Sequence, residues 1–406
     1  MSPQTLRLVL LVSCAHALVH VYELVFPSVE LLVKADLDVA DTSTIGLLAS
    51  AWAFPFGAGA LMAGWLADRY GSVPVLVAYL LGCGMLSGCV GLAPTVQAML
   101  PAMFLMGSFA SLYHPAGLAI ISRATTPRNR GIALGYHGVL GSAGIAGAPF
   151  FAGLMLRWLD WREIYLLLVV PGLLLGAAIA YLLREARVGP SKPSAEPSID
   201  AASRPDEVEG QLRLFFLLCV VSAVYGFIYR GFLTFLPRYL SGTNLWGITA
   251  GLPQETAINY LAASVLLVGI AGQFFAGHLC GRVNLEKLML AILLGIVPFL
   301  FQMQIAEGPA KLFATGGFAL IFFMWQPVSN CLIARYTSLR RRSLSYGLSF
   351  FLSFGLGSTG AYFAGWVTDQ FGLKNLYPVL GCLAMAAAGI AVLIYLLARE
   401  PSVDFQ

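Results

Sequence analysis

The chain has 406 residues, of which 58% are hydrophobic and only 11% are Asp, Glu, Lys or Arg. A soluble domain is about 45–50% apolar and about 25% charged, so this composition excludes a soluble fold. The net charge of +4 does not form a basic face, since Lys and Arg lie between the apolar stretches, and a nucleic-acid partner is therefore not expected. The 7 Cys have no Cys-x-x-Cys spacing, which argues against a disulfide or metal framework.

Twelve apolar stretches follow one another, each close to the ~20 residues that a tilted helix needs to cross a bilayer. The first set covers 8–33, 45–67, 73–92, 96–122, 132–156 and 164–183, and the second covers 212–240, 256–280, 288–305, 310–334, 344–368 and 376–398. The sequence therefore predicts an all-α polytopic membrane protein with twelve transmembrane helices. The first stretch is too long for a cleavable signal sequence, so we expect it to be the first span.

The interval between the two sets is rich in Pro, Ser and charge, which is typical of a flexible linker. We therefore predict an N-terminal six-helix bundle over 1–183, a linker over 184–211 and a C-terminal six-helix bundle over 212–406. Loops on the side of the linker hold 17 Lys and Arg, against 6 on the other side. Because positive loops stay in the cytoplasm, we expect both termini to be cytoplasmic and the protein to lie in a bacterial-type inner membrane.

The two sets also repeat each other in sequence at an offset of 212 residues. The Tyr-His-Pro of 113–115 aligns with the Trp-Gln-Pro of 325–327, and the Phe-Ala-Gly of 151–153 aligns with the same residues at 363–365. Such a repeat predicts two pseudo-symmetric halves with a substrate site near mid-membrane where they meet.

The segment after the second stretch, over residues 64–71, reads Gly-Trp-Leu-Ala-Asp-Arg-Tyr-Gly. It resembles the Gly-x-Leu-Ala-Asp-Arg-x-Gly signature of the major facilitator superfamily, and the resemblance extends over the whole chain and implies that fold. We interpret Gly64, Asp68 and Arg69 as a conformational gate that pairs with neighbouring helix ends in one state and releases them in the other. The second copy keeps Arg282 but has Gly281 in place of the acid, so a gate there would be weaker or differently paired. The alternative is helix packing and orientation charge alone.

Within that superfamily, three features are most similar to the fosmidomycin-resistance branch of drug/proton antiporters. They are the Tyr-His-Pro-Ala-Gly of 113–117, the glycine-spaced fifth helix and the His-bearing first helix. The fifth helix has Gly147-Ala148-Pro149 where the antiporter pattern has an adjacent Gly-Pro. Tight packing by small residues would explain most of these glycines without transport chemistry.

The first apolar stretch carries the clearest signal for chemistry. His16, His20, Glu23, Pro27 and Glu30 advance by four, three, four and three residues and so fall on one stripe of a helix. A carboxylate as deep as Glu23 would be too costly against lipid, so we expect the stripe to face a cavity. The alternative is that these groups bond only to one another in a buried core. Glu30 lies near the outer end and is expected to reach water.

At a nearby offset of 210 residues, Arg230 aligns with His20 and Pro237 aligns with Pro27. Arg230 is the only Arg or Lys that these spans place deep in a helix. A buried cation needs an anion, which we expect to be Glu23 or the negative group of a substrate. The predicted substrate-binding residues are the polar and aromatic side chains at comparable depth: His16, His20, Glu23, His114, His137, Tyr225, Tyr229, Arg230, Gln326 and Asn330.

These patterns predict a proton-coupled secondary transporter that moves a small anionic or amphipathic solute by alternating access, with export favoured over import. Glu23, His20 and Arg230 would couple transport to protons. The sequence shows neither a Gly-x-x-x-x-Gly-Lys loop nor a nucleophile paired with a base, so neither a cofactor nor an enzyme activity is expected. The expected partners are the solute, protons and the lipid bilayer, and the protein is expected to act as a monomer.

A second hypothesis is transport of a transition-metal ion or metal chelate held by His16, His20 and Glu23, with His114 and His137 as nearby ligands. Arg230 would repel a bare cation, and neither a Met-rich nor a Cys-rich ligand set accompanies the histidines. A third class, a membrane enzyme or a receptor that does not transport, lacks any supporting motif.

Overall fold

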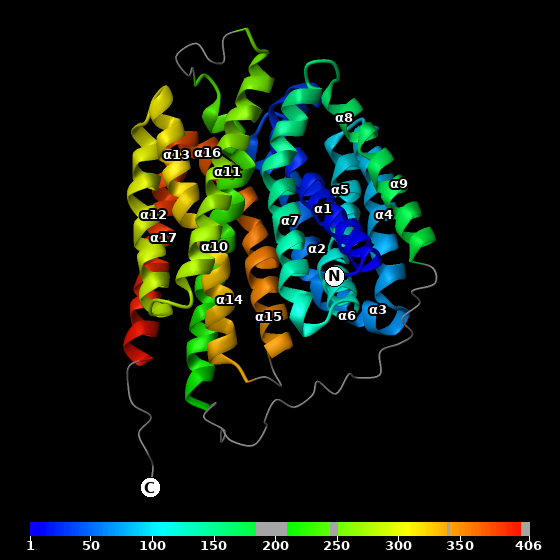
Figure 1. The fold of residues 1–406 in the computed structure, drawn as a ribbon. Helices are drawn as coiled ribbons and strands as arrows, with labels where there is room; N and C mark the ends of the chain where they lie inside the picture. The colour runs from blue at the N-terminus through cyan, green and yellow to red at the C-terminus, as the bar shows by residue number, and fades with distance from the viewer. Residues whose placement is uncertain (184–208, 244–250, 339–341, 399–406) are drawn as a thin grey trace, which may run out of the picture.

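The computed structural model describes residues 1–183, 209–243, 251–338 and 342–398, which are almost entirely helical (Figure 1). The first half consists of α1 (Pro3–Asp36), α2 (Thr42–Ala58), α3 (Ala60–Tyr70), α4 (Ser72–Gly91), α5 (Val96–Ala110), α6 (Tyr113–Ala124), α7 (Pro127–Met155), α8 (Trp161–Leu167) and α9 (Val169–Leu182). The second half consists of α10 (Glu209–Leu240), α11 (Gln254–Leu279), α12 (Leu285–Ile305), α13 (Pro309–Phe322), α14 (Trp325–Tyr336), α15 (Arg342–Phe350), the π-helix η1 (Phe351–Gly355), the 3₁₀ turn η2 (Leu356–Ser358), α16 (Thr359–Phe371) and α17 (Leu373–Leu397). Residues 184–208 of the predicted linker lie outside the described residues.

Within these ranges, ten helical segments are long and apolar enough to cross a bilayer, and α2 with α3, bent by 48°, makes an eleventh. The remaining predicted span, 344–368, corresponds to the four consecutive pieces α15, η1, η2 and α16. The predicted all-α fold of twelve spans in two bundles is thus confirmed.

Two of the helix breaks come directly from proline. Pro115 and Pro327 have no N–H to donate to the carbonyl four residues earlier, and their rings clash with it. The chain accordingly breaks at Ser111–Leu112, between α5 and α6, and at Phe323–Met324, between α13 and α14. These breaks are 212 residues apart, so the sequence repeat is also a structural one.

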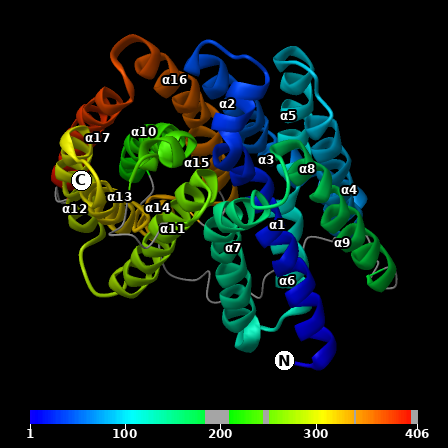
Figure 2. The same cartoon turned by 90° about the horizontal axis from the view of Figure 1, so that it is seen from above.

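The two bundles lie side by side, with α1–α9 in one and α10–α17 in the other (Figures 1 and 2). Across their interface α1 packs against α10, α2 against α16 and η1, and α7 against α11. The approach to η1 is close, because a Cβ at Gly57 of α2 would overlap the backbone of Phe354, and one at Gly226 of α10 would overlap that of Ser353. Glycine is needed at both positions, and α2 and α10 therefore meet on the π-helix.

We call the end of the bundles where α9 ends and α10 begins the linker side, and the opposite end the far side; the linker side is the lower end in Figure 1. Polar contacts join the halves on the far side. Arg238 of α10 donates from Nε to Glu30 of α1 (2.7 Å) and from Nη1 to Thr42 of α2 (3.0 Å). Asp369 of α16 accepts from the backbone N–H groups of Thr42 (2.7 Å) and Ser43 (2.8 Å) at the start of α2.

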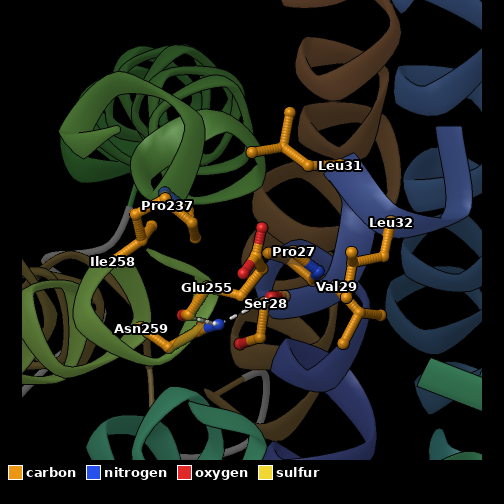
Figure 3. Close-up of a pocket in the computed structure, with 9 residues that line it drawn as sticks. All are labelled: Pro27, Ser28, Val29, Leu31, Leu32, Pro237, Glu255, Ile258 and Asn259. Carbon is orange, nitrogen blue, oxygen red and sulfur yellow. Dashed lines mark hydrogen bonds between the residues drawn. The ribbon is translucent and has the colours of Figure 1, made fainter. Parts of the chain in front are cut away.

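A third far-side contact lies beside a small pocket between α1, α10 and α11 (Figure 3). The Nδ2 group of Asn259 donates to the carbonyl oxygens of Ser28 and Glu255, each at 2.9 Å (Figure 3). Pro27 and Pro237, which pair in the sequence repeat, both line this pocket. The halves are therefore held together on the far side by contacts from α1, α2, α10, α11 and α16.

Candidate functional site

The polar stripe of α1 lies in the interior of the protein, where α1 packs along α7. His16 is 8% exposed, and its ring stacks on that of His137 of α7 with centroids 4.0 Å apart. Gly141, one turn further along α7, faces the same ring, and a Cβ there would collide with it. A glycine of the fifth span therefore leaves the space that the His16 ring occupies.

A chain of hydrogen bonds runs along this stripe. The Oε2 atom of Glu23 lies 2.7 Å from Nδ1 of His20, and Nε2 of His20 lies 3.2 Å from Nε2 of His16. Nδ1 of His16 then lies 2.8 Å from the carbonyl oxygen of His137. The ring of His137 makes a further contact, since its Nε2 atom lies 2.9 Å from the hydroxyl of Tyr113. That hydroxyl donates to the carbonyl of Val12 (3.0 Å).

The number of protons in this chain follows from the bonding capacity of its atoms. A carbonyl oxygen only accepts, so Nδ1 of His16 must donate to His137. Three hydrogen bonds link Glu23, His20, His16 and that carbonyl, and each needs one proton between its two atoms. Two neutral imidazoles supply one N–H each, which is one proton short. The observed bonds therefore require one further proton, held by Glu23 or by one of the two imidazoles.

Arg230 of α10 approaches Glu23 from the other half of the molecule. Its Nη2 atom lies 2.7 Å from Oε1 of Glu23, and the two side chains are 6% and 1% exposed. The angles at this ion pair are not those of a hydrogen bond, and Nε and Nη2 of Arg230 have no hydrogen-bond acceptor among the described residues. The indole N–H of Trp52 on α2, whose ring centroid lies 5.9 Å from the guanidinium carbon, is likewise buried without an acceptor. Buried donors of this kind are costly unless an acceptor reaches them.

A cavity of 130 Å³ opens in the second half, between α10, α14 and the α15–η1 segment. Tyr225, Trp325 and Phe350 contribute aromatic walls, while Gln326 and Asn330 contribute amides. Asp, Glu, Lys, Arg and His are absent from the described residues that line it.

The structure brings most of the sequence-predicted residues together. His16, His20, Glu23, His137 and Arg230 form the polar network described above. Tyr229 packs beside the Arg230 guanidinium at 5.5 Å, and Tyr225, Gln326 and Asn330 line the neighbouring cavity. His114 contacts His16 edge-on, with centroids 5.3 Å apart, and also packs against Phe350 of the other half (5.7 Å).

In this conformation the three residues predicted as metal ligands do not converge on one point. Glu23 meets His20 at Nδ1 while His16 meets it at Nε2, so the two partners lie at opposite edges of one ring. His16, His20 and His114 instead offer ligand atoms that all lie within 4.8 Å of one another.

The predicted gate residues lie apart from this network, on the linker side. Asp68, Arg69 and Arg282 are exposed, and Gly64 has open space where a Cβ would be, so it makes no close helix contact in this conformation. The second half does hold a buried acid nearby. Glu286 of α12 is 1% exposed and lies 3.1 Å from Nη1 of Arg335.

Glu30 overturns one sequence interpretation and adds a contact that the sequence did not reveal. It was expected to reach water, yet it is fully buried because Arg238 of the other half covers it. Trp52 and Tyr113 were not predicted as site residues, although Tyr113 belongs to the Tyr-His-Pro motif that the repeat aligns with residues 325–327. For Glu30 the available signal was Arg238, an opposite charge at the matching depth of the seventh span.

Comparison with known proteins decides the family. The model of the Major Facilitator Superfamily matches residues 11–253. The chain belongs to the major facilitator superfamily. Its fold is also that of a bacterial homolog to the human lysosomal transporter Spinster, in an inward-facing and occupied conformation, with a TM-score of 0.78 at 14% identity over 99% of this chain and 100% of that one. This major facilitator protein is thus a multi-pass membrane protein.

Two relatives show the range of the similarity. The 3-(3-hydroxy-phenyl)propionate transporter of Escherichia coli (strain K12) is 26% identical over 305 residues, covering 70% of this chain and 71% of the relative. The puromycin resistance protein of Streptomyces alboniger is 35% identical over 131 residues, covering 32% of this chain. This chain spans only 26% of the length of that resistance protein.

Proposed function

We propose that this transporter couples the movement of a small anionic or amphipathic solute to protons, by alternating access of a central site built around Glu23 and Arg230, with export favoured. The observation that carries the proposal is the proton count of the Glu23–His20–His16 chain, where three hydrogen bonds require one proton more than two neutral imidazoles provide. That extra proton is the one we assign to transport. Removing it breaks one of the three bonds and so changes the packing of α1.

The anion preference rests on Arg230 and Trp52. Both side chains are buried and carry N–H groups without an acceptor among the described residues. A carboxylate, sulfonate or phosphonate oxygen is the kind of acceptor that satisfies such donors, and a charged one binds a guanidinium most strongly. The propionate named for the Escherichia coli relative is an anion of this class.

Coupling follows from the fact that Glu23 and the solute need the same cation. Glu23 faces Arg230 through Oε1 and the histidines through Oε2. A solute anion that takes Arg230 competes with ionised Glu23 for its counter-charge, and proton binding to Glu23 removes that competition. Solute and proton occupancy are thereby linked through one ion pair that joins the two halves.

The observed conformation fits a state that is open towards the linker side. Ion pairs and hydrogen bonds from Arg238, Asp369 and Asn259 close the far side. With the positive loops on the linker side, we infer that this side is cytoplasmic, that both termini lie there and that the membrane is a bacterial-type inner membrane. The resistance protein among the relatives supports export, and membership of the fosmidomycin-resistance branch stays a prediction.

Transport in proteoliposomes tests this proposal. Purified protein should move small radiolabelled organic anions against their gradient when a pH difference is imposed, and a protonophore should abolish the accumulation. The sign of the pH difference that drives accumulation gives the direction of coupling. Equal fluxes with and without the pH difference would contradict proton coupling.

A second candidate function, transport of a transition-metal ion, is favoured by the grouping of His16, His20 and His114. The His20→Ala variant separates the two functions. If the solute is an organic anion, this variant should keep anion binding and shift only the pH profile of transport. If the cargo is a metal, wild-type proteoliposomes should take up zinc or cobalt ions and His20→Ala should lose that uptake.

A further inference from the structure

The cavity in the second half has the dimensions of a single ring. Its volume of 130 Å³ is close to that of a cavity of about 150 Å³ known to take up benzene. A six-membered ring would therefore fit.

The walls of this cavity are rich in aromatic rings. The rings of Tyr225 and Trp325 lie nearly parallel, at 22° with centroids 5.2 Å apart, and Phe350 and Phe354 lie 4.6 Å from each other on the opposite segment. Aromatic faces stabilise a bound ring by stacking or edge-on contact, beyond the area that they bury.

The polar groups of the cavity are neutral. The amides of Gln326 and Asn330 are exposed, and neither makes a side-chain hydrogen bond within the described part of the chain. Because the described lining carries no Asp, Glu, Lys, Arg or His, a charged group would lose its hydration there without a counter-charge. The lining therefore suits an uncharged ring with a hydrogen-bonding substituent.

The cavity and the anion-binding residue Arg230 share helix α10. Tyr225 precedes Arg230 by five residues on α10, which is about 7.5 Å along the helix axis. Tyr229 connects the two places, since its ring lies 6.4 Å from that of Tyr225 and 5.5 Å from the Arg230 guanidinium. A molecule with its ring in the cavity can thus place an acid group, on a short chain, against Arg230.

We propose that the cavity binds the ring of the transported solute, and that the solute is a small monoanion carrying one aromatic ring. This inference rests on the proposed anion transport at Arg230 and extends it to the other end of the solute. Trp52 and Arg230 contact the acid from both halves, whereas the ring is held by the second half alone. The solute would accordingly stay with the second half as the first half moves.

Equilibrium binding to the purified, full-length protein in lipid nanodiscs tests the inference with three matched probes: 3-phenylpropionate, its neutral amide 3-phenylpropanamide, and hexanoate, which has the acid without the ring. The wild type should bind 3-phenylpropionate at least about tenfold more tightly than hexanoate, as burial of one ring implies. Equal affinity for these two acids would overturn the ring site. Equal affinity for the acid and its amide would instead overturn the anion site of the proposed function.

Two variants locate the ring. Ser329→Phe fills the cavity with a side-chain ring and should remove the preference for 3-phenylpropionate while leaving hexanoate affinity within about twofold. Asn330→Leu, at an exposed position that tolerates change, should lose the extra affinity for 3-(4-hydroxyphenyl)propionate over 3-phenylpropionate. Ser264→Phe on α11, outside the cavity, is the control and should behave as wild type. A ring preference that survives in the folded Ser329→Phe variant would contradict this placement.

Discussion

At the scale of single residues, the site depends on how closely α7 approaches the His16 ring. Gly141 faces that ring, and a Cβ would collide with it, whereas Gly138 of the same helix has open space at the Cβ position. His16 cannot simply move away, because Nδ1 bonds the His137 carbonyl and Nε2 bonds His20. The hydrogen-bond chain is thus sensitive to a single methyl group.

Gly141→Ala should therefore impair transport at least about tenfold, because the displaced His16 no longer bonds His20. The overpacking should also lower the free energy of unfolding by about 1–3 kcal/mol. Gly138→Ala is the matched control and should transport like the wild type. Initial rates in proteoliposomes, with melting temperatures in detergent, measure both effects; an unimpaired Gly141→Ala variant would show that the His16–His20 bond is not needed.

The sequence anticipated part of this site. Spacing of four and three residues was sufficient to place His16, His20 and Glu23 on one face of α1, since helical periodicity is local. It could not show that Glu30 is covered by Arg238, or that Trp52 lies beside Arg230, because those contacts join residues about 180 or more positions apart.

At the scale of elements, the start of α2 is held by acids from both halves. Asp41 accepts from the backbone N–H of Thr44 (2.8 Å) within its own half, and Asp369 of α16 accepts from Thr42 and Ser43 across the interface. Free N–H groups at a helix start favour a negative charge. The contact between Asp369 and the start of α2 therefore acts as a latch that closes the far side.

Asp369→Ala should shift the conformational equilibrium by about tenfold or more towards a state open on the far side, since it removes two charge-assisted hydrogen bonds. Distances between spin labels at the far-side ends of α5 and α13 would report the shift as a larger fraction of molecules with a long label-to-label distance. Lys374→Ala is the control, because it breaks an exposed ion pair with Glu307 inside the second half. An unchanged distance distribution in Asp369→Ala would mean that the latch does not contribute to closure.

Two of the breaks inside predicted spans had a signal in the sequence, because a proline follows each of them. Pro115 and Pro327 mark the breaks before α6 and α14, and their spacing of 212 residues was visible in the sequence. The π-helix η1 had no such signal, because it arises where Gly57 and Gly226 let α2 and α10 approach one segment from two sides. π-Helical turns are frequent at functional sites, and this one carries Phe354 into the wall of the cavity.

At the scale of the whole molecule, the two halves share a fold but differ in chemistry. Four of the five His lie in the first half. His16 and His20 form the proton-bearing chain with Glu23, and the chain ends at the carbonyl oxygen of His137 on α7. The second half contributes Arg230 and an uncharged aromatic cavity. The repeat predicted the symmetric scaffold, but divergence of individual side chains, not symmetry, determines which half carries protons.

The central claim, that Glu23 carries the coupled proton, is tested most directly by Glu23→Gln in proteoliposomes, where solute exchange and transport driven by a pH difference are measured on the same preparation. Gln keeps the shape of a protonated carboxyl but cannot release a proton. We expect solute exchange to persist and pH-driven accumulation to be lost, while the control Glu307→Gln, at an exposed position, retains both. Accumulation driven by the pH difference at the wild-type rate in Glu23→Gln would contradict the account.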